Sequence, residues 1–486
     1  MPSDSSSSAA AVGSDEPNDY ALPALSRFGE RFSVDSGILE LMQDLDLALN
    51  SRSKKEYLML GGGNPARIPA VERRIREAMR DLMADGDRFE RMIGIYDHPQ
   101  GGTEFRSAVA ELLRAECGWR IDAANIALTN GSQSSFFQLF NLLGGEDRAG
   151  RLRRVLLPLI PEYIGYGETG IAPDLFEALP PLIERIDAAV PTKRAGDSRG
   201  ERGSASQRAR RTFKYHLDFE SLEGRLRTAH SGGDVAALCV SRPTNPSGNV
   251  LNDADLRRLS DSAREAGVPL IIDCAYGLPF PGVDFTGSRP FWNSNTIVTL
   301  SLSKLGLPGV RTGIVVARPE IAAGLRRMNA VMNLASGGVG PALARDLVRS
   351  GEILRLSRDF IAPFYRAKSD AAVERFHELF ADLEGCRVHA NEGAFFLWLW
   401  FDGLPIGTDE LYRRLKARGV LVVPGRYYFP GLAEAGPGGE SVESRDLIQR
   451  HRHECIRVSC AQDEALVAEG LRRIAEEARA AYRSGG

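Results

Sequence analysis

Six short, almost unbroken apolar runs constrain the fold of this 486-residue chain more than any other feature. A strand buried on both faces of a parallel sheet is apolar throughout, whereas a strand with one solvated face alternates. Amphipathic stretches such as 253–266 separate the runs. The sequence therefore predicts an α/β fold with a parallel sheet and helical crossovers. The expected strands are residues 126–129, 155–159, 235–241, 269–273, 296–300 and 313–317.

The pattern changes at about residue 346, where long helical stretches replace the alternation. We expect a large domain over 76–345 and a smaller α+β domain over 346–486, with residues 25–75 as the N-terminal segment of the small domain. In the C-terminal part the pattern indicates helices over 354–380, 408–418 and 464–483, and strands near 395–401 and 456–459.

Two segments have the composition of unstructured chain. Residues 1–24 are polar and low in complexity, which is typical of a disordered tail. Residues 192–211 carry seven basic and two acidic side chains and are expected to be a disordered, solvated insert. A nucleic-acid patch is the alternative, but no aromatic residue is interleaved and the whole chain is not basic.

Composition excludes several classes of protein. Lys plus Arg number 61 against 64 Asp plus Glu, so no overall charge attracts nucleic acid or an anionic membrane. The longest apolar run, 394–401, is far shorter than a membrane span, and no secretory signal is visible. The six cysteines form no CxxC pair, which favours reduced thiols in a cytoplasmic protein.

The residues that follow the expected strands are the candidates for a binding site, because parallel sheets bind ligands beyond their carboxyl ends. Asn130-Gly131-Ser132-Gln133 follows the first run and leads into an apolar helix. Such a turn offers free N–H groups to a phosphate, but Ser132 as an ordinary helix cap explains it equally well.

The other strand ends add further polar groups. Tyr163 follows the second run, and Asn245 lies in a Pro-rich turn after the third. Asp273 ends the fourth run, with Tyr276 three residues on, and Lys304 follows the fifth. Each has an ordinary explanation when taken singly. Together they supply what pyridoxal 5'-phosphate (PLP) requires, since its pyridinium nitrogen needs an anion and its aldehyde needs a lysine.

The segment around Lys304, SLSKLGLPGVRTG (301–313), resembles the lysine signature of the fold-type-I aminotransferases. The resemblance covers nearly the whole chain, from GGGNP (61–65) to CIR (455–457), and within the superfamily it is strongest to the valine–pyruvate aminotransferases. It implies a large domain with a mostly parallel seven-stranded sheet, a smaller α+β domain, and PLP as the cofactor.

The resemblance also implies roles for individual residues. Lys304 would form the Schiff base and then move a proton between Cα and C4′, while Asp273 would pair with the pyridinium nitrogen. Tyr276 and Asn245 would bind the ring 3-oxygen, and Tyr163 would stack on the ring. The residues expected around the phosphate are Gly131, Ser132, Gln133, Ser301, Ser303 and Arg311.

Substrate and partner contacts follow from the same resemblance. Arg457 would clamp the substrate carboxylate, with Gly63 and Asn64 nearby. Tyr96, ten residues before Arg106, has the spacing of a tyrosine that reaches the phosphate of a neighbouring subunit. This implies a homodimer with shared active sites.

The implied function is transfer of an amino group between a small or branched apolar amino acid and a 2-oxo acid such as pyruvate. Cys274, Ser459 and Cys460 depart from the family pattern, and the Lys304–Arg311 spacing is one residue shorter than in many relatives. These departures leave open a PLP-dependent elimination, replacement or carbon–carbon bond-forming enzyme. A PLP-binding DNA regulator is disfavoured because no helix-turn-helix precedes residue 60. No metal site is expected, since the only His-rich segment, 451–455, adjoins the Arg457 strand.

Overall fold

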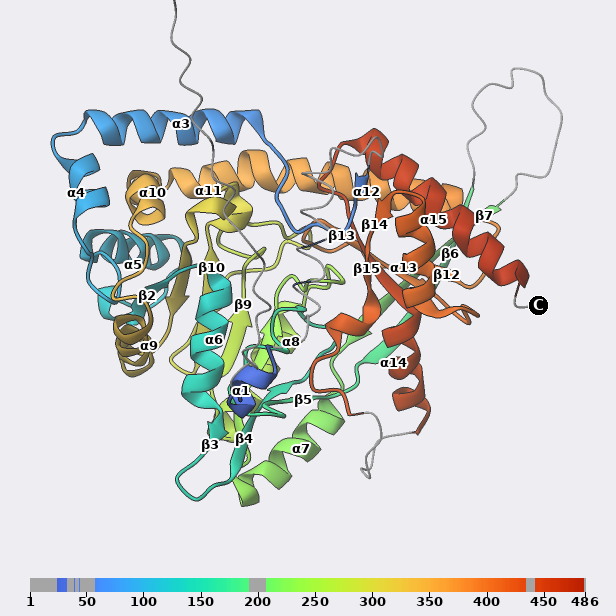
Figure 1. Ribbon diagram of the computed structural model, residues 1–486, viewed down its shortest axis with the longest axis horizontal. Helices are drawn as coiled ribbons and strands as arrows, with labels where there is room; N and C mark the ends of the chain where they lie inside the picture. Colours follow the sequence, from blue (N-terminus) through green and yellow to red (C-terminus); the bar gives the residue numbers. More distant parts are fainter. Residues whose placement is uncertain are drawn as a thin grey trace, which may run out of the picture. The chain divides into compact units, whose positions relative to one another are not determined.

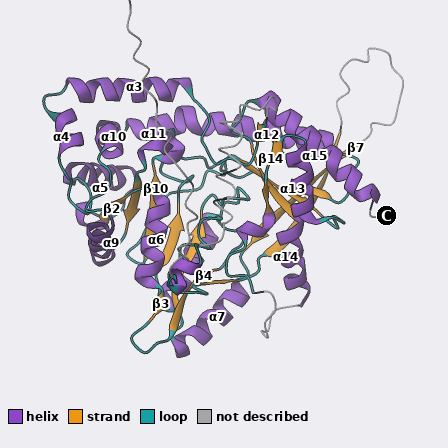
Figure 2. Ribbon diagram, in the orientation of Figure 1, coloured by secondary structure: helices purple, strands orange, loops and turns teal. Residues whose placement is uncertain are grey.

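A mostly parallel sheet of eight strands contains the six strands that the sequence predicts (Figure 1; Figure 2). Its strands are β2 (Ile126–Thr129), β3 (Gly145–Glu146), β4 (Leu152–Leu157), β5 (Phe176–Ala178), β8 (Val235–Ser241), β9 (Leu270–Asp273), β10 (Thr296–Ser301) and β11 (Gly313–Val316). The order is β2-β11-β10-β9-β8-β4-β3, and β5 pairs with β4. Pairing is parallel from β10 through β9 and β8 to β4 and β5, whereas β11 runs antiparallel to β10 and β2.

The six expected strands are confirmed, with small shifts at their ends. Every residue of β2, β8, β9, β10 and β11 is buried, which is why these strands are read as unbroken apolar runs. The short strands β3 and β5 were not expected, because two or three residues carry no pattern that distinguishes a strand from a loop.

The computed structural model describes residues 24–32, 39, 43, 57–191, 207–433 and 442–484. Residues 1–35 and 36–486 are separate units. In the first, Ser26 Oγ accepts a 3.0 Å hydrogen bond from Gly29 N and caps helix α1 (Arg27–Glu30). All of the expected tail over 1–24 except its last residue lies outside the described part of the chain.

Helices pack on the first sheet. Helix α6 packs against β10 and β11, α5 and α9 pack against β2, and α8 packs against β9. Asn252 Oδ1 caps α8 by accepting hydrogen bonds from Ala254 N and Asp255 N. The helices of this part are α3 (Pro69–Ala84), α4 (Arg88–Gly94), α5 (Thr103–Cys117), α6 (Ser132–Leu143), α7 (Phe219–Gly232), α8 (Asp253–Glu265), α9 (Pro319–Met332) and α10 (Val339–Arg349).

A second sheet has the order β15-β16-β13-β12-β7-β6. Its strands are β6 (Leu182–Pro191), β7 (Gln207–His216), β12 (Cys386–His389), β13 (Phe396–Phe401), β15 (Val423–Pro424) and β16 (Cys455–Ser459). Helices α12 and α14 pack against β13. The helices of this part are α11 (Glu352–Leu356), a π-helical segment (Ser357–Ile361), α12 (Ala362–Leu379), α13 (Gly407–Ala417), α14 (Val442–Glu454) and α15 (Glu464–Ser484). Strand β1 (Leu58–Met59) pairs in parallel with β14 (Val420–Leu421), so the N-terminal segment joins the C-terminal part.

The hairpin of β6 and β7 shows that the prediction of a disordered insert over 192–211 is wrong at its C-terminal end. Residues 192–206 lie outside the described residues, but 207–211 are strand and not loop. Their backbone pairs with β6, for example Arg211 with Asp187, and this pairing needs no apolar side chains, so composition did not reveal it. Through β7 and β12 the hairpin joins the second sheet. Residues 36–486 form one unit, and the domain division at residues 76 and 346 stays a prediction.

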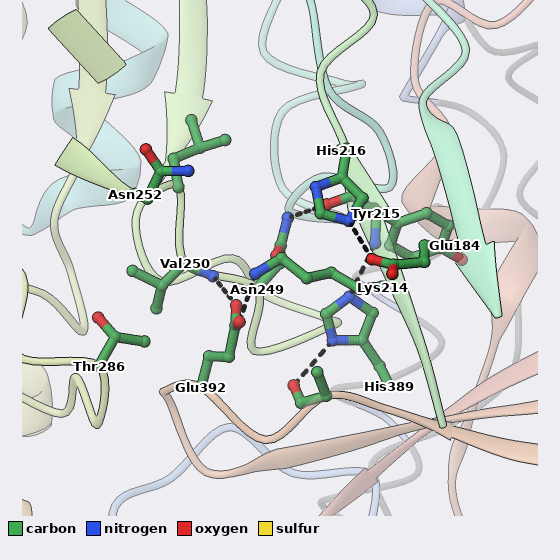
Figure 3. Close-up of polar contacts among 12 residues, drawn as sticks. Glu184, Lys214, Tyr215, His216, Asn249, Val250, Asn252, Thr286, His389 and Glu392 are labelled. Atoms are coloured by element: carbon green, nitrogen blue, oxygen red, sulfur yellow. Dashed lines mark hydrogen bonds and ion pairs between the residues drawn. The ribbon is translucent and has the colours of Figure 1, made fainter. Parts of the chain in front are cut away.

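Polar contacts tie the hairpin to the turn after β8 (Figure 3). Asn249 Nδ2 donates a 3.1 Å hydrogen bond to the carbonyl of Tyr215 on β7. Val250 N donates to Glu392 Oε2 at 3.0 Å, and Glu392 precedes β13. These bonds fix the turn that carries Asn245 against the second sheet. Among the described residues, no helix is long and apolar enough to cross a bilayer.

Candidate active site

Lys304 lies in a 3₁₀ turn (Ser303–Leu305) just after β10. Its Nζ donates a 2.7 Å hydrogen bond to the carbonyl of Gly63, and it lies 5.3 Å from the ring centroid of Tyr276. Burial, with the nearby charges of Arg457 and Arg311, lowers the pKa of Lys304 to about 8. At that pKa about a tenth of the amine is uncharged at pH 7, and this neutral form is the nucleophile.

Asp273, the last residue of β9, is 6% exposed. Its Oδ2 accepts a hydrogen bond from Tyr166 Oη and its Oδ1 accepts one from Ala275 N, both at 2.8 Å. Burial raises the pKa of Asp273, while these donors and the charge of Lys304 oppose that rise. Sequence reasoning missed Tyr166; its spacing of three residues from Tyr163 is the only signal that could have indicated it.

The N-terminus of α6 can cradle an anion. Gly131 occupies the cap position with φ 87°, and no side chain caps the helix, so Ser132 is its first residue and not its cap. The first amides of the helix therefore have no intrahelical acceptor. A Cβ on Gly131 would lie 2.2 Å from Nη2 of Arg311, so only glycine lets this guanidinium approach the turn. Free N–H groups beside a cation suit a phosphate.

The remaining expected phosphate ligands lie near this turn. Ser301 ends β10, which pairs with β11, and Ser301 Oγ accepts a 3.1 Å hydrogen bond from Ser303 N. Gln133 donates through Nε2 to the carbonyl of Gly165 at 2.9 Å, while its buried Oε1 has no partner among the described residues. Tyr163 packs edge-on against Tyr166, with 5.5 Å between ring centroids.

Arg457, on β16, is a buried cation without an anion. It is 2% exposed and forms no ion pair with a described residue. Nη1 donates to Asn245 Oδ1 at 2.7 Å and Nη2 donates to the carbonyl of Gly61 at 2.6 Å, but the buried Nε has no acceptor. A buried guanidinium with an unused donor fits a carboxylate supplied by a ligand.

A cavity of about 360 Å³ opens beside Lys304. Tyr365 Oη, from α12, accepts a 2.8 Å hydrogen bond from Ala66 N and so holds the segment over the cavity. Arg67 also lines the cavity, although its side chain is 86% exposed and pairs with Glu72. Sequence reasoning noticed neither Tyr365 nor Arg67. The lining is mostly apolar: Asn64, Pro65, Ala66, Arg67, Ile68, Val71, Glu72, Ile75, Lys304, Leu305, Gly306, Pro308 and Tyr365.

One expected ligand is not in this group. Tyr96 is 81% exposed and makes no described contact with Lys304 or the α6 turn. The chain therefore brings together the other expected residues but leaves Tyr96 on its surface.

The three residues that depart from the family pattern, Cys274, Ser459 and Cys460, pack inside the protein and do not face the cavity beside Lys304. Cys274 and Cys460 are buried, and Cys460 Sγ lies 3.3 Å from Ser369 Oγ on α12. Ser459 Oγ accepts a 3.3 Å hydrogen bond from Ala461 N. None of the three lines the cavity beside Lys304. Within the described residues no cluster could hold a metal ion, and His451 instead lies 2.7 Å from Tyr215 Oη.

Comparison with known proteins gives consistent matches. A family model for aminotransferase class I and II matches residues 203–474. The valine–pyruvate aminotransferase of Escherichia coli (strain K12) is 41% identical over 457 residues, covering 94% of this chain and 98% of that protein. A crystal structure of valine–pyruvate aminotransferase from Salmonella typhimurium LT2, 41% identical, has a TM-score of 0.75 and covers 92% of this chain and 100% of its own. A Pyrococcus horikoshii kynurenine aminotransferase crystallised in complex with PMP is 20% identical, with a TM-score of 0.70 over 94% of this chain and 97% of its own, and shares the fold.

Proposed function

This chain belongs to the class I and II aminotransferases, and we propose that it transfers the amino group of valine or alanine to a 2-oxo acid such as pyruvate. PLP is its cofactor. The observation that carries the assignment of an amino-acid substrate is the buried guanidinium of Arg457, which forms no ion pair with a described residue and lies close enough to Lys304 to lower the pKa of that amine.

The residues fit PLP. The uncapped first turn of α6 and Arg311 would hold the phosphate, together with Ser132, Gln133, Ser301 and Ser303. Asp273 would face the ring nitrogen, and its buried carboxylate keeps three donors that favour the charged form. Tyr163 would stack on the ring, and Tyr276 and Asn245 would bind its 3-oxygen.

When bound, PLP accepts the amino group and delocalises the electron pair left on Cα. Lys304 would hold the cofactor through its amine, and the freed amine would carry a proton between Cα and C4′. A pKa of about 8 suits both tasks near neutral pH, because the amine can accept and return a proton.

Arg457 would fix the direction of the substrate by pairing with its α-carboxylate. Its Nη groups are already held by Asn245 and the Gly61 carbonyl, so the guanidinium is positioned before substrate arrives. The aliphatic part of the cavity, including Ile68, Val71 and Ile75, favours an apolar side chain. Arg67 is engaged by Glu72 and does not present a free charge to a second carboxylate.

The proposal includes a homodimer with shared sites. The exposed apolar side chains Ile93, Ile95, Tyr96 and Val331 come from two neighbouring segments, joined by the 2.9 Å hydrogen bond from Asn329 Nδ2 to the Pro99 carbonyl. This surface lies near the α6 turn, since Asn329 Nδ2 also donates to the carbonyl of Leu128 on β2, three residues before Gly131. Such a patch is typical of a protein–protein interface, and Tyr96 within it could reach a partner's phosphate site. The six free cysteines, five of them buried, support a cytoplasmic location.

An amino-acid panel tests the function. Stoichiometric enzyme with PLP is mixed with valine, alanine or aspartate, and cofactor absorbance and released 2-oxo acid are measured. Valine or alanine should each release one equivalent of 2-oxo acid per site, and pyruvate should then restore the original spectrum. Spectral changes without release of 2-oxo acid would refute transamination and favour the elimination or bond-forming alternative.

A further inference from the structure

A buried carboxyl group that takes no direct part in the proposed chemistry lies behind Asp273. Glu162 is 0% exposed and forms no ion pair with a described residue. Its Oε1 accepts a 2.7 Å hydrogen bond from Ser241 N, and its Oε2 contacts Ser241 Oγ. An isolated buried carboxylate is costly, so this group requires either a proton or a compensating charge.

Glu162 is the end of a chain of four side chains. After the Glu162–Ser241 contact, Ser241 Oγ lies 3.2 Å from Tyr166 Oη, and Tyr166 Oη lies 2.8 Å from Asp273 Oδ2. All four residues are buried. The chain therefore links the carboxyl of Glu162 to the carboxyl that is expected to face the ring nitrogen.

The number of protons decides the state of this chain. Three contacts need three protons, and the hydroxyls of Ser241 and Tyr166 supply two. If both carboxyls were ionised, one contact would join two lone pairs with no proton between them. One carboxyl must therefore be protonated for every contact to be a hydrogen bond.

The charges around the two ends place that proton on Glu162. Asp273 feels the positive charge of Lys304, which favours its ionised form. Burial, the largest effect on Glu162, and the negative charge of Asp273 both favour the protonated form. The hydrogen bonds that Glu162 accepts from Ser241 N and, at 3.3 Å, from Tyr163 N act in the opposite direction but do not outweigh burial. Tyr163, Tyr166 and Cys239 are titratable groups near Glu162, and all three are neutral at pH 7 because burial raises their pKa values.

We propose that Glu162 is a protonated positioning residue, which donates to Ser241, so that Ser241 donates to Tyr166 and Tyr166 donates to the ionised carboxylate of Asp273. Donors aligned in one direction polarise one another and strengthen the last bond. Glu162 thereby holds Asp273 in the charged form that the ring nitrogen needs. The consequence for catalysis rests on the proposed role of Asp273, whereas the protonation of Glu162 does not. In agreement, burial raises the pKa of Glu162 to about 8.

Infrared difference spectroscopy at pH 7 tests the protonation without any turnover. Exposed carboxyls are ionised at this pH, so a buried protonated carboxyl gives a separate C=O band. The band should be present in the wild-type protein with and without PLP, should vanish in Glu162→Gln and should persist in Asp273→Asn. A band that is missing from the wild type, or that persists in Glu162→Gln, would overturn the proposal.

Turnover tests the effect on Asp273. Glu162→Leu removes the first donor at similar volume, and Ser241→Ala interrupts the chain one step later, so either variant suffices if the other fails to fold. Each should lower kcat about tenfold, the effect of one neutral hydrogen bond, with little change in the KM for the amino acid. Glu162→Gln keeps a donor and an acceptor in place and should recover most of that loss. Equal losses in Glu162→Gln and Glu162→Leu would mean that a negative charge, and not a donor, is required, which contradicts the proposal.

Discussion

Arg457 Nη1 donates a 2.7 Å hydrogen bond to Asn245 Oδ1, which joins strand β16 of the second sheet to the turn that follows β8 of the first. The two residues are expected to bind different groups, Asn245 the cofactor and Arg457 the substrate. Their contact connects those tasks, because the amide that would bind the ring oxygen also orients the guanidinium.

Arg457→Ala should lower kcat/KM for the amino acid by about 30- to 900-fold, equivalent to roughly 2–4 kcal/mol, because a buried charge-assisted pair loses one partner. Steady-state kinetics with valine and pyruvate measure this. Arg413→Ala is the control, and its kcat/KM should be nearly unchanged because the Arg413 side chain is 74% exposed on α13. Equal kcat/KM values in the two variants would show that a residue other than Arg457 binds the substrate carboxylate.

Lys304→Ala should abolish amino transfer and the covalent attachment of PLP. Borohydride should fix the cofactor to the protein in the wild type, and peptide mapping should then find it on the peptide that contains Lys304. In the variant no peptide should carry the cofactor. Lys368→Ala is the control and should keep the attachment, because Lys368 Nζ on α12 donates to the carbonyl of Gln462 and lies outside the cavity beside Lys304. Attachment to any other lysine would refute the assignment.

Asp273→Asn should reduce turnover far more than PLP occupancy. The amide removes the negative charge that keeps the ring nitrogen protonated, while the α6 turn and Arg311 still hold the phosphate. Occupancy is measured by absorbance after gel filtration and turnover by release of 2-oxo acid. Near-normal turnover would exclude Asp273 from this role.

Capture of PLP by the apoenzyme should depend on pH with a midpoint near 8. The amine of Lys304 attacks only when neutral, so the rate should fall about tenfold per pH unit below the pKa and level off above it. Stopped-flow absorbance measures this rate. Arg457 is one of the causes of the lowered pKa, so Arg457→Ala should shift the midpoint upward. A rate that keeps rising up to pH 10 would show that the amine is not activated.

Mixing two variants that are each impaired at limiting PLP tests the shared site. If each site combines Lys304 from one subunit with Tyr96 from the other, a heterodimer of Lys304→Ala and Tyr96→Phe contains one intact site. Random reassociation should then restore about a quarter of wild-type turnover at limiting PLP. Activity equal to the mean of the two parents would mean that each subunit builds its site alone.

Sequence reasoning anticipated the parts of the molecule that have a local signal. The buried strands were visible because their sequences are almost entirely apolar. Asp273 and Lys304 were visible because the first ends such a strand and the second lies just after one. Tyr166 and Glu162 had no such signal, since their importance arises from contacts across 107 and 79 residues of chain. The beginning of β7 was missed for a related reason: backbone pairing holds residues 207–211, and pairing leaves no mark in composition.

The hydrogen bond between Arg457 and the Gly61 carbonyl spans 396 residues of the chain. During synthesis Gly61 leaves the ribosome early, and its partner follows only when most of the protein has been made. Strand β1 likewise cannot pair until β14 has been synthesised, and the carbonyl of Gly63 cannot accept its hydrogen bond until Lys304 has been synthesised. The binding site is therefore among the last parts of the protein to form, and a chain released before residue 457 would have neither the carboxylate clamp nor the strand that holds it.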